Sequence, residues 1–353
     1  MNLRKKVMYS MMAAVLLGSS QLAGQALAAQ AEQTEVVAST QPAAQVQKSA
    51  KINPQKFAGY IWRIDAANED KLPRNFRTMN SSFRTDVNAG KTGKDFNSNP
   101  SRQGLSSLNA SGSAEFSEKE FEKMIPVLKA EAKGPIYIVD LRQESHGFFN
   151  GTAVSWYGRR DWGNVGKTPA MALADEKKRL KEAKGRTVVM SKLDKHKMPA
   201  EPEEVKVTSV QSEEELVKRH GLRYFRITAT DHVWPNPDNI DTFINFVRTL
   251  PKDAWLHFHC QAGQGRTTAY LAMYDMMKNP DVLFGDILSR QYLLGNNYVA
   301  YMGNSKQDDW KNHYYKEKAR MIAKFYQYVQ ENHASDYSTS WSQWLANSAY
   351  PFE

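Results

Sequence analysis

The sequence of 353 residues contains only one cysteine, Cys260, so it cannot form an intramolecular disulfide. It has no internal repeat, and no apolar run long and unbroken enough to serve as a permanent membrane anchor. No nucleic-acid-binding module is recognisable, although the formal net charge of +9 would attract a polyanion. These absences argue against a disulfide-stapled scaffold, a repeat array and an integral membrane protein. They leave a globular chain with one distinctive thiol.

The N-terminus has the pattern of a secretory signal peptide. Basic residues at 4–6 precede an apolar stretch at 11–17, and Ala26-Leu27-Ala28 has the small-x-small pattern of a cleavage site. We expect residues 1–28 to be removed and the protein to be exported, either to the periplasm or as a secreted protein, with no membrane anchor. Cleavage would remove three positive and no negative charges, so the net charge would fall from +9 to +6. The alternative is a frayed N-terminal helix of the mature protein.

The rest of the chain divides into a short linker and one large domain. Residues 29–50 are mostly Ala, Gln, Ser, Thr and Val with few aromatic side chains, which predicts a disordered linker. Residues 51–353 can bury a sizeable core, and we expect one catalytic domain there.

One stretch, residues 259–268, carries the strongest chemical signal. It reads His-Cys-Gln-Ala-Gly-Gln-Gly-Arg-Thr-Thr. The apolar run at 254–258 predicts a buried strand before it, and 267–277 predicts a helix after it. A strand, a glycine-rich turn and a helix start together aim backbone N–H groups at an anion, so we expect a phosphate loop at residues 260–266. The residues expected to line it are Gln261, Ala262, Gly263, Gln264 and Gly265.

Cys260 is expected at the floor of this phosphate loop as a nucleophile. The helix N-terminus and the guanidinium of Arg266 both favour a thiolate, and the planar guanidinium can hold two phosphate oxygens at once. A plain buried cysteine is the alternative, but it would not require the surrounding glycines, arginine and threonine. The spacing Cys-x5-Arg-Thr instead resembles the signature of cysteine-dependent phosphatases. A Walker-type loop is excluded because no Gly-Lys-Ser/Thr follows the glycines.

Asp231, which follows a predicted strand at 222–227, is the best candidate for a general acid. Attack of the Cys260 thiolate on a phosphate monoester gives a phosphocysteine, and the leaving alkoxide needs a proton at once. The ionised Asp231 could then activate the water that breaks the phosphocysteine. We expect Thr267 to hydrogen-bond the thiolate and His259 to orient the loop from below. The alternative for Asp231 is a capping aspartate near the next helix.

Alternating strands and helices predict an α/β fold with a mostly parallel sheet flanked by helices on both faces. Strands are expected at 56–64, 105–116, 135–141, 222–227 and 256–260, and helices at 117–132, 213–220, 237–250, 267–277, 281–294 and 309–332. Residues 146–212 are less regular, with a charged helix near 175–184 and strand-like runs at 186–190 and 205–210. We interpret them as an insertion that forms a small β-rich subdomain.

Three motifs together resemble the bacterial protein-tyrosine-phosphatase-like phytases, also called cysteine phytases. They are the phosphate loop, the Asp-His-Val-Trp-Pro sequence at 231–235 and the Asp-Leu-Arg-Gln-Glu sequence at 140–144. The similarity runs from about residue 53 to the end of the chain. It implies a cysteine-phosphatase core that carries a small partial β-barrel subdomain. It also implies stepwise hydrolysis of myo-inositol hexakisphosphate (phytate).

The resemblance further implies residues that bind phosphates other than the one being cleaved. These are Arg77, Asp161, His196, Lys197, His232, Lys311, Tyr315 and Lys318. Taken without the resemblance, Arg77 could be a surface charge and the basic turn at 194–199 a solvated loop. Residues 311, 315 and 318 share one helix face, which could equally be a solvated stripe.

Two other functions remain open on the sequence. One is a phosphatase for phosphotyrosine or phosphoinositides, and the other, from a different class, is an inactive phosphate-binding module. The expected reaction needs no metal or cofactor, and no convincing cluster of metal ligands is recognisable. The net charge of +6 and the lysines of the predicted contacts suit a polyanionic substrate, although basic proteins also bind nucleic acid or anionic lipid.

Overall fold

The computed structural model describes residues 52–304 and 309–348. The predicted signal peptide and linker, residues 1–28 and 29–50, lie outside these described residues. Within them, no helix is both long and apolar enough to cross a bilayer.

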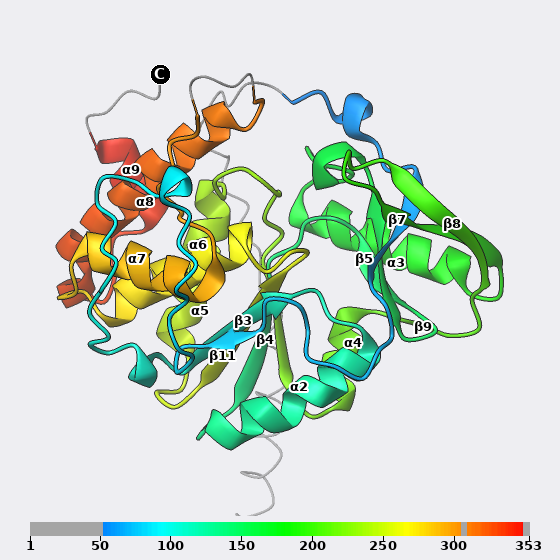
Figure 1. The fold of residues 1–353 in the computed structure, drawn as a ribbon, viewed down its shortest axis with the longest axis horizontal. Coiled ribbons are helices and arrows are strands. Elements are labelled where there is room, and N and C mark those ends of the chain that lie inside the picture. The colour runs from blue at the N-terminus through cyan, green and yellow to red at the C-terminus, as the bar shows by residue number, and fades with distance from the viewer. Residues whose placement is uncertain (1–51, 305–308, 349–353) are drawn as a thin grey trace, which may run out of the picture. The chain divides into compact units, whose positions relative to one another are not determined.

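A five-stranded sheet forms the centre of the fold (Figure 1). Its order is β10 (Arg223–Arg226), β4 (Ile136–Asp140), β11 (Trp255–Cys260), β3 (Ala110–Ala114) and β2 (Arg77–Thr78). All neighbours are parallel except β2, which runs antiparallel to β3. The mostly parallel sheet predicted from the sequence is therefore confirmed. β11 lies between β4 and β3 and runs parallel to both. The loop that follows it therefore lies at the carboxyl edge of the sheet, where α/β proteins bind ligands.

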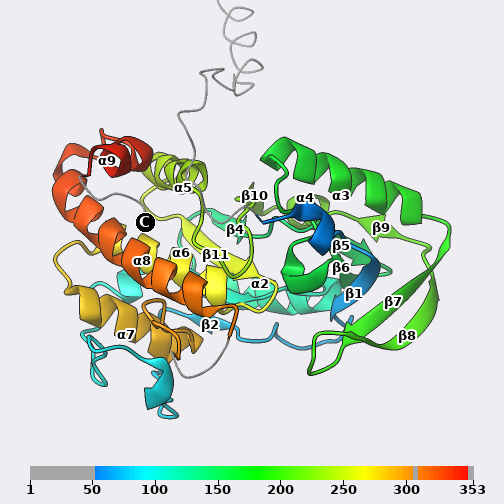
Figure 2. The same cartoon turned by 90° about the horizontal axis from the view of Figure 1, so that it is seen from above.

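Helices cover both faces of this sheet (Figure 1). They are α2 (Glu118–Glu131) and α4 (Glu213–Arg219) on one face, and α5 (Pro237–Thr249), α6 (Gly265–Lys278), α7 (Phe284–Gly295), α8 (Asn312–Asn332) and α9 (Trp341–Asn347) on the other. The alternation of side chains along β11 explains this division. Leu256 and Phe258 join the core with α5 to α9, whereas Trp255 joins the core with α2 and α4. Figure 2 shows α8 alongside α6.

The helix starts follow the capping signals of the sequence. Ser117 caps α2 and accepts a hydrogen bond from the Glu120 N–H, while the Glu120 carboxylate accepts from the Ser117 N–H. Ser212 and Glu215 form the same reciprocal pair at α4. Because these caps are local, the sequence predicted both starts correctly.

A second sheet of six strands accounts for the predicted β-rich insertion, residues 146–212, and extends beyond it. Its order is β8 (Pro199–Lys206), β7 (Thr187–Leu193), β1 (Ile61–Ala66), β6 (Thr152–Tyr157), β5 (His146–Phe149) and β9 (Val210–Gln211). Helix α3 (Pro169–Ala183) packs on it through Leu180 and Ala183. The sheet thus takes in β1, which lies well before the insertion. The partial barrel implied by the resemblance stays a prediction.

The strand predicted at 205–210 was wrong in its bounds. The chain instead forms β8 at Pro199–Lys206 and the two-residue β9 at Val210–Gln211. Two prolines and three glutamates make the first segment look like a loop in the sequence. It is an exposed edge strand, where a proline removes no ladder hydrogen bond and charges discourage pairing with another chain. Short 3-10 helices complete the fold: η1 (Pro54–Phe57), η2 (Ala89–Lys91), η3 (Ser106–Leu108), η4 (Arg159–Asp161) and η5 (His333–Ser335).

Candidate active site

The phosphate loop joins the end of β11 to the start of α6, as the sequence predicted. Cys260 is the last residue of β11 and is buried, and the Thr267 hydroxyl donates a hydrogen bond to its sulfur at 3.1 Å. Gly263 has a φ of +69°, and a Cβ at this position would lie 2.3 Å from the backbone nitrogen of Ala114. The loop therefore packs so closely on β3 that this position requires glycine.

Arg266 is held from behind in a fixed orientation. Its Nη1 donates to the carbonyls of Leu141 and Ala229 at 3.2 and 3.0 Å, and Nη1 and Nη2 both donate to Glu144. Its Nε lies 3.2 Å from Asp231 Oδ1 without hydrogen-bond geometry. Burial alone would lower the pKa of Arg266, but Asp231 and Glu144 raise it well above its usual value. The Nε edge of a permanently charged guanidinium thus remains available to an anion.

Asp231, the predicted general acid, lies beside the Nε edge of Arg266. Burial alone would raise the pKa of Asp231, but the charge of Arg266 lowers it below its usual value. The second carboxylate oxygen lies 3.2 Å from His232 Nε2. Burial lowers the pKa of His232 to about 4, so its ring is neutral near neutral pH. Asp231 is therefore a carboxylate with Arg266 as its main countercharge.

Residues 74–77 support the phosphate loop from the outside. Side chains of this segment donate to three successive loop carbonyls: Arg74 to Gln261 at 3.5 Å, Asn75 to Ala262 at 2.7 Å and Arg77 to Gly263 at 2.7 Å. Carbonyls turned outward in this way leave the loop amides free to face inward. The sequence pointed only to Arg77.

Arg77 itself is buried behind the loop. Besides Gly263, its guanidinium donates to the Asn75 carbonyl at 3.0 Å and to the Thr268 hydroxyl at 3.3 Å. Burial lowers the pKa of Arg77 to about 10, against the opposing charge of Cys260. The structure therefore gives Arg77 a positioning contact with the loop, and its direct contact with a phosphate stays a prediction.

A buried set of ion pairs connects the second sheet to Arg266. Arg142 is fully buried and lies 2.9 Å from Asp65 of β1, 2.6 Å from Glu115 and 2.9 Å from Glu144. Glu144 in turn holds Arg266. Arg142 and Glu144 belong to the Asp-Leu-Arg-Gln-Glu motif, but their partners in other segments could not be predicted from the sequence.

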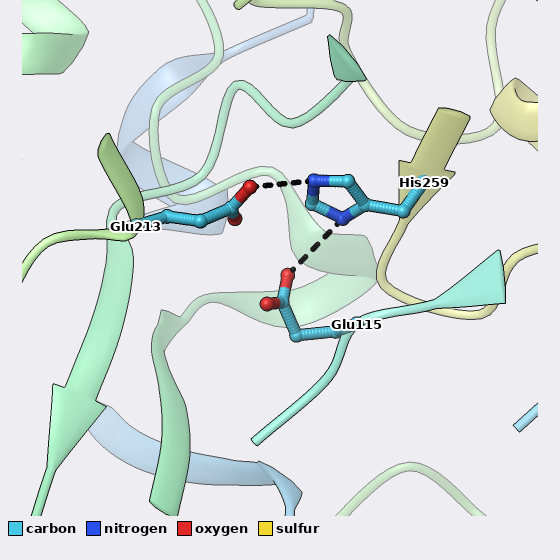
Figure 3. Close-up of side chains that lie close together, drawn as sticks. All are labelled: Glu115, Glu213 and His259. Carbon is cyan, nitrogen blue, oxygen red and sulfur yellow. Dashed lines mark hydrogen bonds and ion pairs between the residues drawn. The ribbon is translucent and has the colours of Figure 1, made fainter. Parts of the chain in front are cut away.

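His259 lies beneath the loop between two glutamates (Figure 3). Its Nε2 is 2.7 Å from Glu213, and its Nδ1 is 3.6 Å from Glu115. Burial alone would lower the pKa of His259, but Glu213 and Glu115 raise it to about 9. The ring is therefore charged near neutral pH, and its ion pairs fix the strand that ends in Cys260. This geometry agrees with the orienting role expected for His259.

Among the described residues, two groups of side chains have the atoms that could ligate a metal ion. They are Glu115, Glu213 and His259, and Asp140, His146 and Glu213. A metal ion needs a neutral imidazole. Burial would favour that form, but neighbouring carboxylates raise the pKa of both histidines, that of His146 well above its usual value. In the structure both histidines take part in buried ion pairs, His259 with Glu213 and His146 with Asp140.

Three of the predicted phosphate contacts lie at the start of α8. Lys311 and Lys318 are half-buried, with their Nζ atoms 5.5 Å from the Trp310 ring centre and 4.9 Å from the Tyr315 ring centre. Burial lowers the pKa of Lys318 to about 8, although Asp231 opposes the shift. The charges of both lysines also act on His232. The structure therefore gathers these positive charges close to His232 and Asp231.

The predicted contacts from the insertion are placed differently. Asp161, at the end of η4, lies 2.6 Å from Arg63, and burial with the nearby charges of Glu144 and Asp231 raises its pKa to about 6 despite Arg63. His196 and Lys197 are exposed at the turn between β7 and β8. The Tyr157 hydroxyl donates to the Lys197 carbonyl at 3.1 Å, and its ring lies 5.1 Å from the Arg63 guanidinium. A contact of the His196 or Lys197 side chain with a phosphate stays a prediction.

Comparison with known proteins agrees with this geometry. The model of the PTP-like phytase family, whose description is "Inositol hexakisphosphate", matches residues 139–278. The effector protein hopD2 of Pseudomonas syringae pv. tomato is 30% identical over 288 residues, which are 79% of this chain and 59% of that protein. A PTP-like phytase structure from Bdellovibrio bacteriovorus is 32% identical with a TM-score of 0.64, covering 84% of this chain and 98% of that one.

Structures from Mitsuokella multacida are more similar in sequence. A tandemly repeated protein tyrosine phosphatase-like phytase is 65% identical with a TM-score of 0.81, over 82% of this chain and 49% of that one. The myo-inositol phosphatase of the same organism, solved with myo-inositol-(1,3,4,5)-tetrakisphosphate, gives the same values. The present chain therefore spans about half the length of the Mitsuokella proteins and 59% of hopD2.

Proposed function

This chain belongs to the PTP-like phytase family, and we propose that it hydrolyses the phosphate monoesters of myo-inositol phosphates, phytate in particular, one phosphate at a time. One observation carries the proposal. The Cys260 sulfur, hydrogen-bonded by Thr267 at 3.1 Å, ends the strand below a loop where the Nε edge of Arg266 lies 3.2 Å from Asp231. A nucleophile, a phosphate-binding cation and a proton donor thus converge on one site.

In the first step the Cys260 thiolate attacks phosphorus, forming the S–P bond while the P–O ester bond breaks. The electron pair of that bond goes to the inositol oxygen, which takes the proton of Asp231. Asp231 must be protonated for this step. A bound phosphate dianion would engage Arg266 and add negative charge beside Asp231, and both changes raise the pKa of this carboxyl from its ligand-free value.

In the second step water attacks the phosphocysteine. The Asp231 carboxylate takes a proton from the water, the new P–O bond forms and the S–P bond breaks. The electron pair returns to Cys260, where the Thr267 hydroxyl stabilises the thiolate. Arg266 and the loop amides hold the equatorial oxygens in both steps, which stabilises the charge that develops there.

The charge around the site supports a polyanionic substrate. The charges of Lys311 and Lys318 act on His232, and Lys318 also interacts with Asp231. One bound phosphate requires only Arg266 and the loop amides, so these additional positive charges favour a substrate with several phosphates. The Mitsuokella structure with an inositol tetrakisphosphate supports the same class of substrate. We propose that Asp161, His196, Lys197, His232, Lys311, Tyr315 and Lys318 contact the phosphates that are not being cleaved.

Comparing two substrates under identical conditions tests this function. The purified protein should release phosphate from phytate with a much higher kcat/KM than from a phosphotyrosine peptide. A higher kcat/KM on the peptide, or on a phosphoinositide, would favour the alternative phosphatases. Binding of phytate with no phosphate released in a single-turnover assay would favour the inactive binding module.

We also propose that the protein is exported after cleavage of residues 1–28. The basic, apolar and small-x-small pattern of this segment supports the proposal. Sequencing the N-terminus of the mature protein from the producing cell would test it. An intact Met1 on the mature protein would contradict it.

A further inference from the structure

A strained turn of the chain lies against the acid loop, residues 229–235. In this turn, which includes η4, Arg160 and Asp161 have φ values of +66° and +61°. Two consecutive non-glycine residues in the left-handed region cost energy, and such strain persists where the surrounding structure uses it. The turn directs Asp161 to Arg63 and is followed by Trp162, whose indole contacts the acid loop.

The Trp162 indole makes one polar contact, with the backbone of the general acid. Its side chain is 1% exposed, and its Nε1 donates to the carbonyl oxygen of Asp231 at 2.9 Å. Three rings from other elements pack edge-on against it: Phe57 at 4.7 Å, Trp310 at 5.6 Å and Tyr314 at 5.8 Å between ring centres. The indole is thus fixed on several sides, and so is the direction of its N–H.

Each neighbour of Asp231 in the acid loop is also held. The Ala229 carbonyl accepts from Arg266 at 3.0 Å, and the Thr230 hydroxyl donates to Gln143 at 2.9 Å. The His232 ring lies edge-on to Trp310 at 5.2 Å. The loop backbone is therefore anchored at consecutive residues, while the Asp231 side chain remains directed at the Nε edge of Arg266.

Arg160 links these rings from the opposite side. Its guanidinium lies 3.8 Å from the ring centre of Trp310 and 5.1 Å from that of Trp162. A cation over an aromatic face at these distances is attractive. The turn that includes η4, which follows β6 of the second sheet, and Trp310, which lies just before α8, thus converge on the acid loop.

We propose that Trp162 is a positioning residue that sets the orientation of the general acid through the Asp231 carbonyl. The inference rests on the proposed phosphocysteine chemistry, but not on the identity of the phosphorylated alcohol. Asp231 has to place its proton on the departing ester oxygen, and small displacements of a catalytic group are costly. The indole N–H fixes the backbone from which that carboxyl extends, before any substrate binds.

The test is Trp162→Phe, which removes the N–H and keeps an aromatic ring. The measured quantity is kcat/KM, which reports the step in which the leaving group departs, on phenyl phosphate and p-nitrophenyl phosphate. Phenolate needs the proton of Asp231, whereas p-nitrophenolate leaves readily without one. We expect kcat/KM on phenyl phosphate to fall roughly tenfold, which is only part of the full contribution of a general acid. The loss on p-nitrophenyl phosphate should be less than threefold.

Trp341→Phe is the matched control, because this indole is also fully buried, in α9, and its Nε1 has no hydrogen-bond partner among the described residues. Trp341→Phe should leave the ratio of kcat/KM on phenyl phosphate to kcat/KM on p-nitrophenyl phosphate unchanged. A double-mutant cycle then separates positioning from folding. Asp231→Asn alone should reproduce the selective loss, and adding Trp162→Phe should reduce kcat/KM on phenyl phosphate no further.

Equal losses on both substrates, or an additional loss in the double variant, would overturn the proposal, and so would an unchanged ratio in Trp162→Phe. Neither substrate contains inositol. If the wild-type protein released no phosphate from phytate, the proposed function would fail while this test could still be carried out.

Discussion

Glu144 accepts hydrogen bonds from both terminal nitrogens of Arg266, at 2.8 Å from Nη1 and 2.9 Å from Nη2. Burial alone would raise the pKa of Glu144, but Arg266 and Arg142 hold it well below its usual value. The pair uses the edge of the terminal nitrogens, and the Nε edge, 3.2 Å from Asp231, makes no hydrogen bond. The orientation of the Arg266 guanidinium therefore depends on Glu144.

Glu144→Gln should weaken every phosphate monoester about equally. The amide can accept from only one of the two nitrogens, and a lost charge-assisted hydrogen bond costs roughly 1.5–3 kcal/mol. We expect kcat/KM to fall roughly 10- to 100-fold on both phytate and p-nitrophenyl phosphate, since both need Arg266. Glu118→Gln, which alters a pair with Arg219 at the surface, is the control. Unchanged kinetics in a folded Glu144→Gln protein would refute the positioning role.

Replacing Lys197 and Lys311 together by Met should instead discriminate between substrates. Each well-formed contact to a phosphate contributes roughly 1.5–3 kcal/mol, so phytate kcat/KM should fall on the order of a hundredfold or more if the two act independently. The rate on p-nitrophenyl phosphate should fall only severalfold, because one phosphate needs only the phosphate loop. The phytate loss should shrink at high salt, where the wild-type attraction is already screened.

Lys316→Met is the control for this pair, since Lys316 is exposed on α8 and lies off the face that carries residues 311, 315 and 318. It should change neither substrate. Equal losses on both substrates in the double variant would mean that these lysines support the fold or the phosphate loop. No loss on either substrate would mean that Lys197 and Lys311 are solvated surface residues.

Stability should fall at alkaline pH because of His259. Its folded pKa of about 9 exceeds the unfolded value of about 6.5. Its contribution is therefore complete below pH 6.5 and is lost as the pH rises through 9. The shift corresponds to about 3 kcal/mol at most. Urea unfolding of wild type and His259→Gln across this range would measure it, and the variant should lose less stability. Parallel curves for the two proteins would contradict the assignment.

Metal removal should leave the activity intact, whereas thiol alkylation should abolish it. The proposed chemistry runs through Cys260, and the histidines of the two candidate ligand groups are occupied in ion pairs. The measurement is phosphate release from phytate after EDTA treatment and after iodoacetamide treatment. Loss in EDTA that added divalent metal restores would count decisively against this mechanism.

The sequence predicted the parts of the site that are local. Cys260 and Arg266 belong to one loop. Asp231 follows β10, which is parallel to β11 and separated from it by β4, so its carboxyl end lies at the same edge of the sheet. The capping boxes and most helix bounds were predictable for the same reason. The phosphate loop geometry agrees with that expectation, including the hydrogen bond from Thr267.

The sequence could not predict contacts that depend on how distant segments meet. Arg142 pairs with Asp65 only because β1 joins the second sheet, and no periodicity in β1 specifies that partner. The support of the loop by Arg74 and Asn75 likewise rests on tertiary packing. Trp162 was visible as a tryptophan in the insertion, but nothing in its neighbours pointed to the carbonyl of Asp231.

The most direct test of the proposed function is a comparison of wild type with Cys260→Ser, with phytate as substrate and a chelator present. The wild-type protein should release several phosphates per phytate, in steps, and the variant should release none. The variant should still bind phytate, measured by calorimetry, because Arg266 and the loop amides remain. Substantial phosphate release by Cys260→Ser, or none by the wild type, would contradict phytate hydrolysis through Cys260.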